Sequence, residues 1–177
     1  MFEKFFVKVY RRISPNSTPL QHPEFGGSGI TEDCYHWIRA NVKSGSPILE
    51  FGAGLVSTPK LSEHYKLTSV EHNKKYIGAF KSHYIYAPLS PNDGWYEVDE
   101  LGELNEMEFD LAIIDGPPGS GNRFGILLNL QFLKNSKQIL VDDTNRPSEK
   151  LLLELLSRAL NRSYSSFENF AVIENYQ

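Results

Sequence analysis

The segment Ile48–Thr58 (ILEFGAGLVST) joins an acidic residue to two closely spaced glycines, a combination typical of a ligand-binding turn. Gly52 and Gly54 permit backbone angles and a close approach that a side chain would prevent. The helix expected after them offers free backbone N–H groups to a polar ligand. The turn can therefore hold a dinucleotide pyrophosphate or another adenosyl compound, or it can be a tight bend without a ligand.

Glu71 places a second carboxylate at the end of the next expected strand. A carboxylate in that position can accept hydrogen bonds from both hydroxyls of a ribose. The glycine turn and Glu71 together indicate an adenosyl ligand.

The residues around the glycines distinguish between two adenosyl ligands. A nicotinamide-binding turn has glycine or alanine three residues after its second glycine, where this chain has Ser57. Glu50 would repel a pyrophosphate but would attract a cation. The turn therefore favours S-adenosylmethionine, which carries an amino group and a sulfonium, and a nicotinamide-dependent oxidoreductase is the alternative.

Three aspartates end two later strands: Asp115, then Asp142 and Asp143. Such carboxylates can act as a general base toward a hydroxyl or amine. Asp115, Asp142 and Asn145 would also form an all-oxygen set for a divalent metal such as Mg²⁺. A helix or turn cap before Pro147 is the structural alternative for one of these aspartates.

Two arginines, Arg123 and Arg146, follow the same strand ends. Their guanidinium groups can bind a carboxylate or phosphate on a substrate. The alternative is that they pair with the neighbouring acids.

Hydrophobic periodicity indicates the elements that must position these residues. Strands are expected at 48–51, 67–71, 84–87, 109–115 and 138–142, with two more within 163–176. Helices are expected at 31–42, 59–65, 74–82, 124–133 and 148–160, with Thr58 capping the second. This alternation predicts an α/β fold with a mostly parallel sheet covered on both faces.

The first 30 residues are expected to form a separate N-terminal unit, an amphipathic helix and a loop, before a domain at 31–177. The helix would pack on the domain or on a second subunit, and a membrane surface is the alternative partner. The chain has 177 residues, one cysteine and a net charge of −4. These features predict a cytoplasmic protein without a nucleic-acid partner.

The sequence resembles the class I S-adenosylmethionine-dependent methyltransferases. Their first motif, acid-x-Gly-x-Gly, matches the segment from Glu50 to Gly54, and their second-strand acid matches Glu71. The loop DGPPG and the segment DDT after strands four and five are also similar to small bacterial members. The resemblance implies a Rossmann-like, doubly wound, seven-stranded sheet whose last strand is antiparallel.

The resemblance also assigns expected roles around the cofactor. Glu50, Gly52 and Gly54 would contact the methionine portion, and the hydroxyls of Ser57 and Thr58 would replace a third glycine. Glu71 would hold the ribose, with His72 near the adenine, and Asp115 would contact the cofactor at the end of the fourth strand, beside the transferred methyl group. The expected adenine pocket or substrate lid includes Ala87, Trp95 and Tyr96, and plain packing is the alternative for the two aromatic residues.

The expected reaction is methyl transfer to a hydroxyl of a small molecule or sugar, because the fourth strand lacks the Asn/Asp-Pro-Pro-Tyr/Phe signature of amino-group methylation. Asp115 is the leading candidate base, followed by Asp142 and Asp143. A metal is not favoured, because the fifth-strand spacing differs from that of catechol-type O-methyltransferases. A non-catalytic adenosyl-binding subunit is a further alternative.

Overall fold

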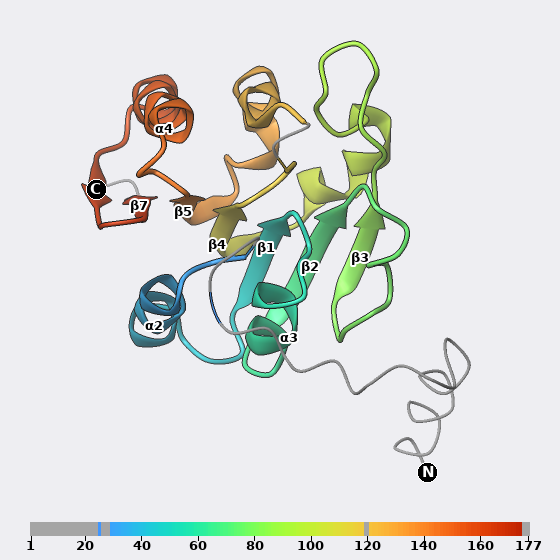
Figure 1. The fold of residues 1–177 in the computed structure, drawn as a ribbon, viewed down its shortest axis with the longest axis horizontal. Coiled ribbons are helices and arrows are strands. Elements are labelled where there is room, and N and C mark those ends of the chain that lie inside the picture. The colour runs from blue at the N-terminus through green and yellow to red at the C-terminus, as the bar shows by residue number, and fades with distance from the viewer. Residues whose placement is uncertain (1–24, 26–28, 119–120, 175–177) are drawn as a thin grey trace.

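The structure is a computed structural model that describes residues 25, 29–118 and 121–174 (Figure 1). The amphipathic helix expected near the N-terminus lies outside these residues. The α-helices are α2 (Glu32–Asn41), α3 (Ser57–Ser62) and α4 (Pro147–Leu160), and the 3₁₀ helices are η1 (Val98–Glu106), η2 (Arg123–Leu128) and η3 (Leu130–Phe132). The strands are β1 (Pro47–Phe51), β2 (Lys66–Glu71), β3 (His83–Tyr86), β4 (Phe109–Ile114), β5 (Ser136–Asp142), β6 (Tyr164–Ser166) and β7 (Phe170–Ile173).

The strands form one seven-stranded sheet in the order β3-β2-β1-β4-β5-β7-β6. β1 to β5 pair in parallel, and β7 pairs antiparallel with both β5 and β6. The strand order reverses between β1 and β4, where ligands of such sheets bind. This arrangement confirms the predicted Rossmann-like fold and its antiparallel final strand.

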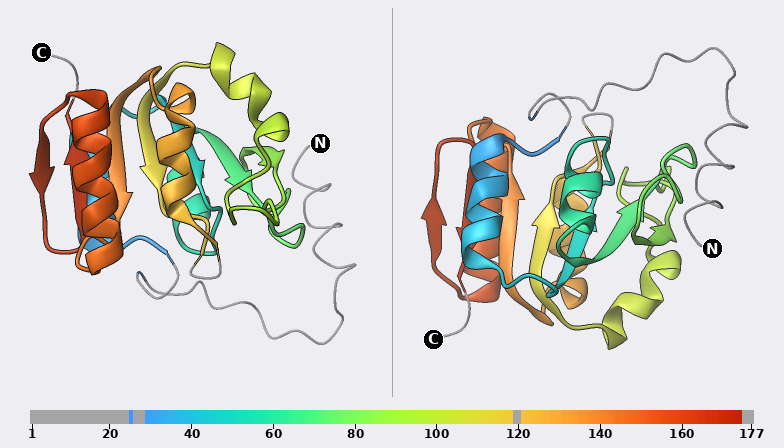
Figure 2. Two further views of the ribbon diagram at one scale, coloured as in Figure 1. Left: turned by 90° about the horizontal axis from the view of Figure 1, so that it is seen from above. Right: turned by 90° about the horizontal axis from the view of Figure 1, so that it is seen from below.

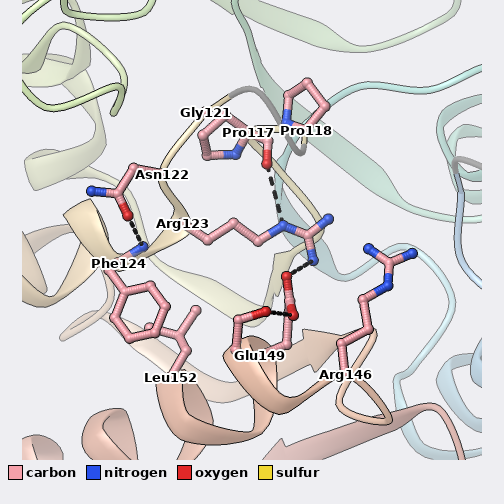
Figure 3. A pocket seen from close by; sticks show the side chains of 10 residues that line it. Pro117, Pro118, Gly121, Asn122, Arg123, Phe124, Arg146, Glu149 and Leu152 are labelled. Carbon is pink, nitrogen blue, oxygen red and sulfur yellow. Dashed lines mark hydrogen bonds and ion pairs between the residues drawn. The ribbon is translucent and has the colours of Figure 1, made fainter.

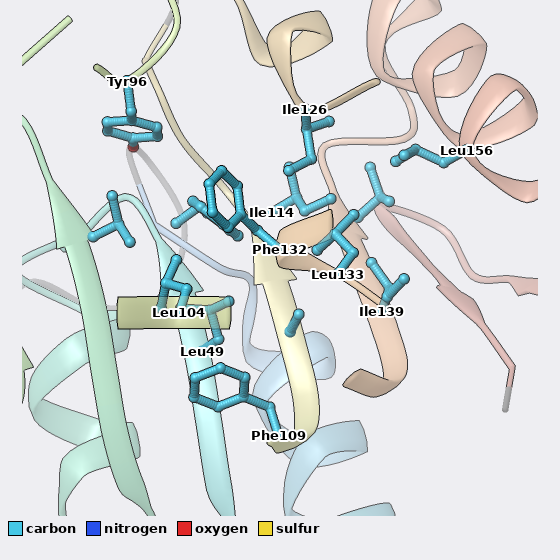
Figure 4. Packing of buried hydrophobic residues seen from close by; sticks show 14 of the residues in the cluster. Leu49, Tyr96, Leu104, Phe109, Ile114, Ile126, Phe132, Leu133, Ile139 and Leu156 are labelled. Atoms are coloured by element: carbon cyan, nitrogen blue, oxygen red, sulfur yellow. The ribbon is translucent and has the colours of Figure 1, made fainter. Parts of the chain in front are cut away.

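Helices cover both faces of the sheet (Figure 2). α2 and α3 lie on one face, whereas α4 and the 3₁₀ helices lie on the other. Each face has its own buried apolar cluster, one that includes Ile38 and Leu61 and one that includes Leu104, Phe132 and Leu156. Figure 4 shows the second cluster, in which side chains of the central strands contact those of the helices. Because both faces are buried, the two central strands β1 and β4 are mainly apolar.

Two of the predicted helices differ in the structure. The helix at 74–82 is absent, and the helix at 124–133 is replaced by two 3₁₀ helices. Residues 74–82 form a series of turns because Gly78 adopts a φ of +73°, and the segment lacks a buried face that would stabilise a helix. The helix predicted at 124–133 is replaced by η2 and η3, which are separated at Asn129. The Asn129 side chain donates a hydrogen bond to the Gly125 carbonyl (2.9 Å). Gly125 packs against Trp95, and a Cβ on Gly125 would lie only 2.3 Å from the Trp95 Cβ.

Two smaller differences concern the ends of elements. α3 begins at Ser57, so Thr58 lies inside the helix and does not cap it. The stretch between β3 and β4, for which no helix or strand was predicted, contains η1. Among the described residues, no helix is both long and apolar enough to cross a membrane.

Candidate functional site

The turn after β1 contacts the loop after β4 through two glycines. Gly52 has a φ of +95°, and a Cβ on it would lie 2.9 Å from both the Cα and the nitrogen of Gly116. A side chain at either position would separate the two loops. The carboxyl ends of β1 and β4 therefore meet at a backbone-to-backbone contact.

Glu50 is fully buried at the base of this turn. Its Oε2 accepts hydrogen bonds from Thr58 Oγ1 (2.8 Å) and Ser69 Oγ (3.0 Å), and Thr58 Oγ1 in turn accepts the Gly54 N–H (2.9 Å). Its Oε1 has no hydrogen-bond partner within the described part of the chain. Burial raises the pKa of Glu50 to about 7, and the hydroxyls of Ser57, Thr58 and Ser69 partly oppose this shift. The carboxylate is thus held in place through Oε2, while Oε1 has no donor of regular geometry among the residues described.

Ser57 lies beside this carboxylate. It is 1% exposed, and its Oγ lies close enough to lower the pKa of Glu50, although it forms no hydrogen bond of regular geometry with any residue that the structure describes. Buried hydroxyls are usually paired, so Ser57 and Glu50 together mark a polar position that a ligand can fill.

Glu71 connects the end of β2 to the glycine turn. Its Oε2 accepts the Ala53 N–H (2.9 Å), and its Oε1 accepts the Asn73 N–H (2.5 Å) and lies 3.0 Å from His72 Nδ1. A carboxylate oxygen has two lone pairs, so each oxygen can still accept a further hydrogen bond. Ala87, buried after β3, donates its N–H to the Glu71 carbonyl (3.0 Å).

Three aspartates gather at the ends of β4 and β5. Ligand oxygens of Asp115, Asp142 and Asp143 lie within 4.8 Å of one another. Burial and the neighbouring carboxylates raise the pKa of Asp115 well above its usual value, and burial together with Asp143 raises that of Asp142 to about 6. Asp143 has a φ of +62°, a left-handed conformation that is uncommon for a residue with a side chain.

The aspartate cluster differs from the expected metal set in one residue. Asn145 donates its side-chain amide to Asn169 Oδ1 (2.9 Å), and the third group beside Asp115 and Asp142 is Asp143. Carboxylate oxygens are suitable ligands for Mg²⁺. The donor chemistry therefore fits a divalent cation, although a guanidinium already contacts two of the three carboxylates.

That guanidinium belongs to Arg123, whose side chain is 10% exposed. It donates to Asp143 Oδ2 (3.2 Å), to the Pro117 carbonyl (3.3 Å) and to the Asp115 carbonyl (2.5 Å), and it lies 3.3 Å from Asp115 Oδ1. Arg123 thus pairs with the neighbouring acids, as the alternative interpretation proposed. Arg146 also contacts Asp143 (2.9 Å), but its side chain is 54% exposed and so retains accessible donors.

A cleft of about 330 Å³ opens beside these residues, between the loop after β4 and the start of α4 (Figure 3). Arg123, Arg146 and Glu149 provide charged groups, while Phe124 and Leu152 provide apolar walls. The cleft is the part of the site most suited to a polar organic molecule.

Trp95 and Tyr96 are both fully buried. Their rings pack on Phe51, with centroid distances of 5.6 Å for Trp95 and 6.0 Å for Tyr96. This is the plain packing proposed as the alternative to a pocket or lid. However, neither the Trp95 Nε1 nor the Tyr96 hydroxyl has a hydrogen-bond partner among the residues described.

The sequence analysis missed Ser69, which fixes Glu50 from β2. A signal was present, because Ser69 is a polar residue in the predicted strand at 67–71, and all five of these residues are buried. A polar side chain in a buried strand requires a partner, and the acid of the neighbouring strand provides it.

Comparison with solved structures identifies the class of fold. The MycE methyltransferase from the mycinamycin biosynthetic pathway, in complex with Mg and SAH, has a TM-score of 0.56 at 13% identity over 86% of this chain and 50% of that chain. A methyltransferase-like protein from Silicibacter pomeroyi has a TM-score of 0.53 at 16% identity, over 81% of this chain and 85% of that one. A methyltransferase from Pyrococcus furiosus has a TM-score of 0.52 at 14% identity, over 97% and 95%.

The chain therefore has the Rossmann-like fold of the class I S-adenosylmethionine-dependent methyltransferases. At the level of sequence, no protein-family model matches the chain, and no curated protein matches it.

Proposed function

We propose that this protein is an S-adenosylmethionine-dependent methyltransferase that acts on a hydroxyl of a small molecule or sugar. The observation that carries the proposal is the buried Glu50 carboxylate, one oxygen of which has no hydrogen-bond partner among the described residues and lies beside the glycine turn. A carboxylate there is unfavourable for a pyrophosphate and favourable for the ammonium group of a methionine moiety. The fold shared with methyltransferases, including one in complex with SAH, supports the same cofactor.

The residues present fit the two ends of this cofactor. Glu50 and Ser57 would hold the methionine portion beside Gly52 and Gly54. Glu71 would accept hydrogen bonds from the ribose, since its orientation is already fixed by the Ala53 N–H. The bound cofactor supplies an electrophilic methyl group, and the chain's own residues orient the acceptor and manage its proton.

Asp115 is the proposed general base. It ends β4 opposite the glycine turn, and Arg123 holds it through contacts to its carbonyl and its side chain. Burial and the neighbouring carboxylates raise the pKa of Asp115, which makes its carboxylate a stronger base than that of an exposed aspartate. Asp115 would take the hydroxyl proton as the acceptor oxygen attacks the methyl group.

The cleft beside Arg146 is the proposed acceptor site. It mixes hydrogen-bonding side chains with the apolar surfaces of Phe124 and Leu152, which suits a hydroxylated ring. Arg146, with its exposed guanidinium, would recognise a carboxylate or phosphate on the acceptor, whereas the Arg123 donors are already used inside the protein.

The cofactor assignment is tested by calorimetric titration of the full chain with S-adenosylmethionine and with NAD. We expect the first to bind and the second not to bind. Binding of NAD alone would support the nicotinamide alternative and overturn the proposal.

The catalytic assignment is tested by assaying S-adenosylhomocysteine formation with monosaccharides, nucleotide sugars and phenols, both with Mg²⁺ and with a chelator. With a substrate found in this way, Asp115→Asn is expected to lower the rate by about 10²–10⁴-fold and to retain cofactor binding. Full activity of Asp115→Asn would show that Asp115 is not the general base. The matched variant Asp142→Asn would then test whether Asp142 is the base instead. Cofactor binding without transfer to any acceptor would favour a non-catalytic binding subunit.

A further inference from the structure

Tyr96 lies in the loop between β3 and η1 and is 0% exposed. Its hydroxyl has no hydrogen-bond partner in the part of the chain that the structure describes. Buried tyrosine hydroxyls usually find a partner, because a buried polar group without one destabilises the folded state. The hydroxyl therefore requires an explanation beyond folding.

The ring of Tyr96 is held by packing alone. It lies 4.9 Å from the Trp95 ring in an edge-on arrangement, 6.0 Å from Phe51 and 6.5 Å from His72, measured between ring centroids. These contacts fix the direction of the hydroxyl without using it. A phenylalanine at this position would make the same ring contacts.

The hydroxyl points toward the carboxyl ends of the strands (Figure 4). A Cβ on Gly116 would lie 2.5 Å from the Tyr96 hydroxyl oxygen and 2.7 Å from the Gly52 Cα. The hydroxyl thus lies at the contact between the β1 turn and the β4 loop. Neither glycine has a side chain that would cover it.

Three carboxylates act electrostatically on this hydroxyl. After burial, Glu71, Asp115 and Glu50 all raise the pKa of Tyr96 further, and Arg123 opposes them. The hydroxyl is therefore neutral at physiological pH and can donate a hydrogen bond. The three acids are those assigned above to the cofactor and to the acceptor.

We propose that Tyr96 is a cofactor-binding residue whose hydroxyl donates a hydrogen bond to the ribose or methionine portion of the bound adenosyl cofactor. This inference rests on the proposed function. It changes the role of Tyr96 from adenine pocket, lid or packing to a specific polar contact at the Gly52–Gly116 junction.

The chain offers a matched control in Tyr65. This residue is also buried, but its hydroxyl lies 3.2 Å from the Ile38 carbonyl and 3.3 Å from that of Val42 and donates to them. Tyr65→Phe removes a satisfied structural hydroxyl, whereas Tyr96→Phe removes an unsatisfied one. The two substitutions should therefore have opposite patterns of effect.

The experiment combines calorimetric titration with S-adenosylhomocysteine and urea unfolding without ligand, on the wild-type chain and both variants. For Tyr96→Phe we expect about 3–15-fold weaker binding, the loss of one hydrogen bond, and a free energy of unfolding no lower than wild type. For Tyr65→Phe we expect lower stability, with an affinity within about twofold of wild type.

The outcomes separate this inference from the proposed function. If the wild-type chain binds and Tyr96→Phe binds equally well, the inference is wrong and the proposed function stands. If Tyr96→Phe lowers stability as Tyr65→Phe does, the hydroxyl is structural and the inference is again wrong. If the wild-type chain binds neither S-adenosylmethionine nor S-adenosylhomocysteine, the proposed function fails, and the role of Tyr96 fails with it.

Discussion

Glu50 and Glu71 are both buried carboxylates at neighbouring strand ends, yet their surroundings differ. Glu71 accepts two backbone N–H groups, one on each oxygen. Glu50 accepts two hydroxyl groups on one oxygen and nothing on the other from the residues described. Backbone donors fix Glu71 as an acceptor, while Glu50 keeps a free oxygen at which a cation can bind.

The environment of Glu50 predicts a pH-dependent stability. Because its pKa rises from 4.5 to about 7 on folding, the native state holds a proton that the unfolded state releases between these values. Stability from this group is therefore present below pH 4.5 and is lost as the pH rises to about 7, by on the order of 3 kcal/mol. Glu50→Gln removes this titration.

Urea unfolding of both proteins between pH 4 and pH 8 measures the effect. We expect the stability of Glu50→Gln to fall less steeply with rising pH than that of the wild type. Equal slopes would show that the buried carboxylate does not titrate in this range. The variant should also bind S-adenosylmethionine more weakly, since an amide cannot neutralise its ammonium group.

At the scale of elements, the site depends on how closely the turn after β1 approaches the loop after β4. Gly52 serves this approach in two ways, through its φ of +95° and through the absence of a side chain against Gly116. Gly45, in the turn before β1, shares the first property with a φ of +86°, but a Cβ there would meet no atom within 4 Å.

The pair of glycines separates backbone strain from steric contact. Gly45→Ala should lower the free energy of unfolding by about 1 kcal/mol, the cost of a left-handed conformation. Gly52→Ala should lower it by about 3 kcal/mol, because the added methyl group also pushes the two loops apart. Urea unfolding measures the free energy of unfolding of both variants. If the two variants lose the same amount of stability, the contact between Gly52 and Gly116 contributes nothing beyond the left-handed backbone conformation.

At the scale of the whole molecule, the β6–β7 hairpin must be fastened to the parallel part of the sheet. Arg162, between α4 and β6, is 6% exposed and donates from its guanidinium to the carbonyls of Ser136, Lys137 and Glu174. It therefore joins the start of β5 to the residue after β7. A buried cation with this many acceptors has a structural role.

Arg162→Gln should lower the free energy of unfolding by about 2–4 kcal/mol, because buried carbonyls lose charged donors. The control is Arg158→Gln on the exposed side of α4, for which we expect a change below about 0.5 kcal/mol. Urea unfolding checks both. Similar losses of stability at the two positions would contradict the proposal that Arg162 stabilises the attachment of the β6–β7 hairpin to β5.

The sequence by itself determined the strands and the residues at their ends. Apolar runs such as 109–114 indicate buried strands wherever they occur, and an acid or glycine that ends such a run must lie at the sheet's carboxyl edge. For this reason Glu50, Gly52, Glu71 and Asp115 could be placed together before the structure was known. The alternation of elements likewise predicted the parallel sheet.

The tertiary structure decided which polar atoms meet. Residues 74–82 have no partner surface that would outweigh the turn at Gly78, so the predicted helix does not form. Asp143 joins the aspartate cluster, while Asn145 turns to Asn169 on the hairpin. Within the described part of the chain, Glu50 Oε1 and the Tyr96 hydroxyl have no hydrogen-bond partner. Their surroundings follow from contacts between segments far apart in the chain, and no local pattern specifies such contacts.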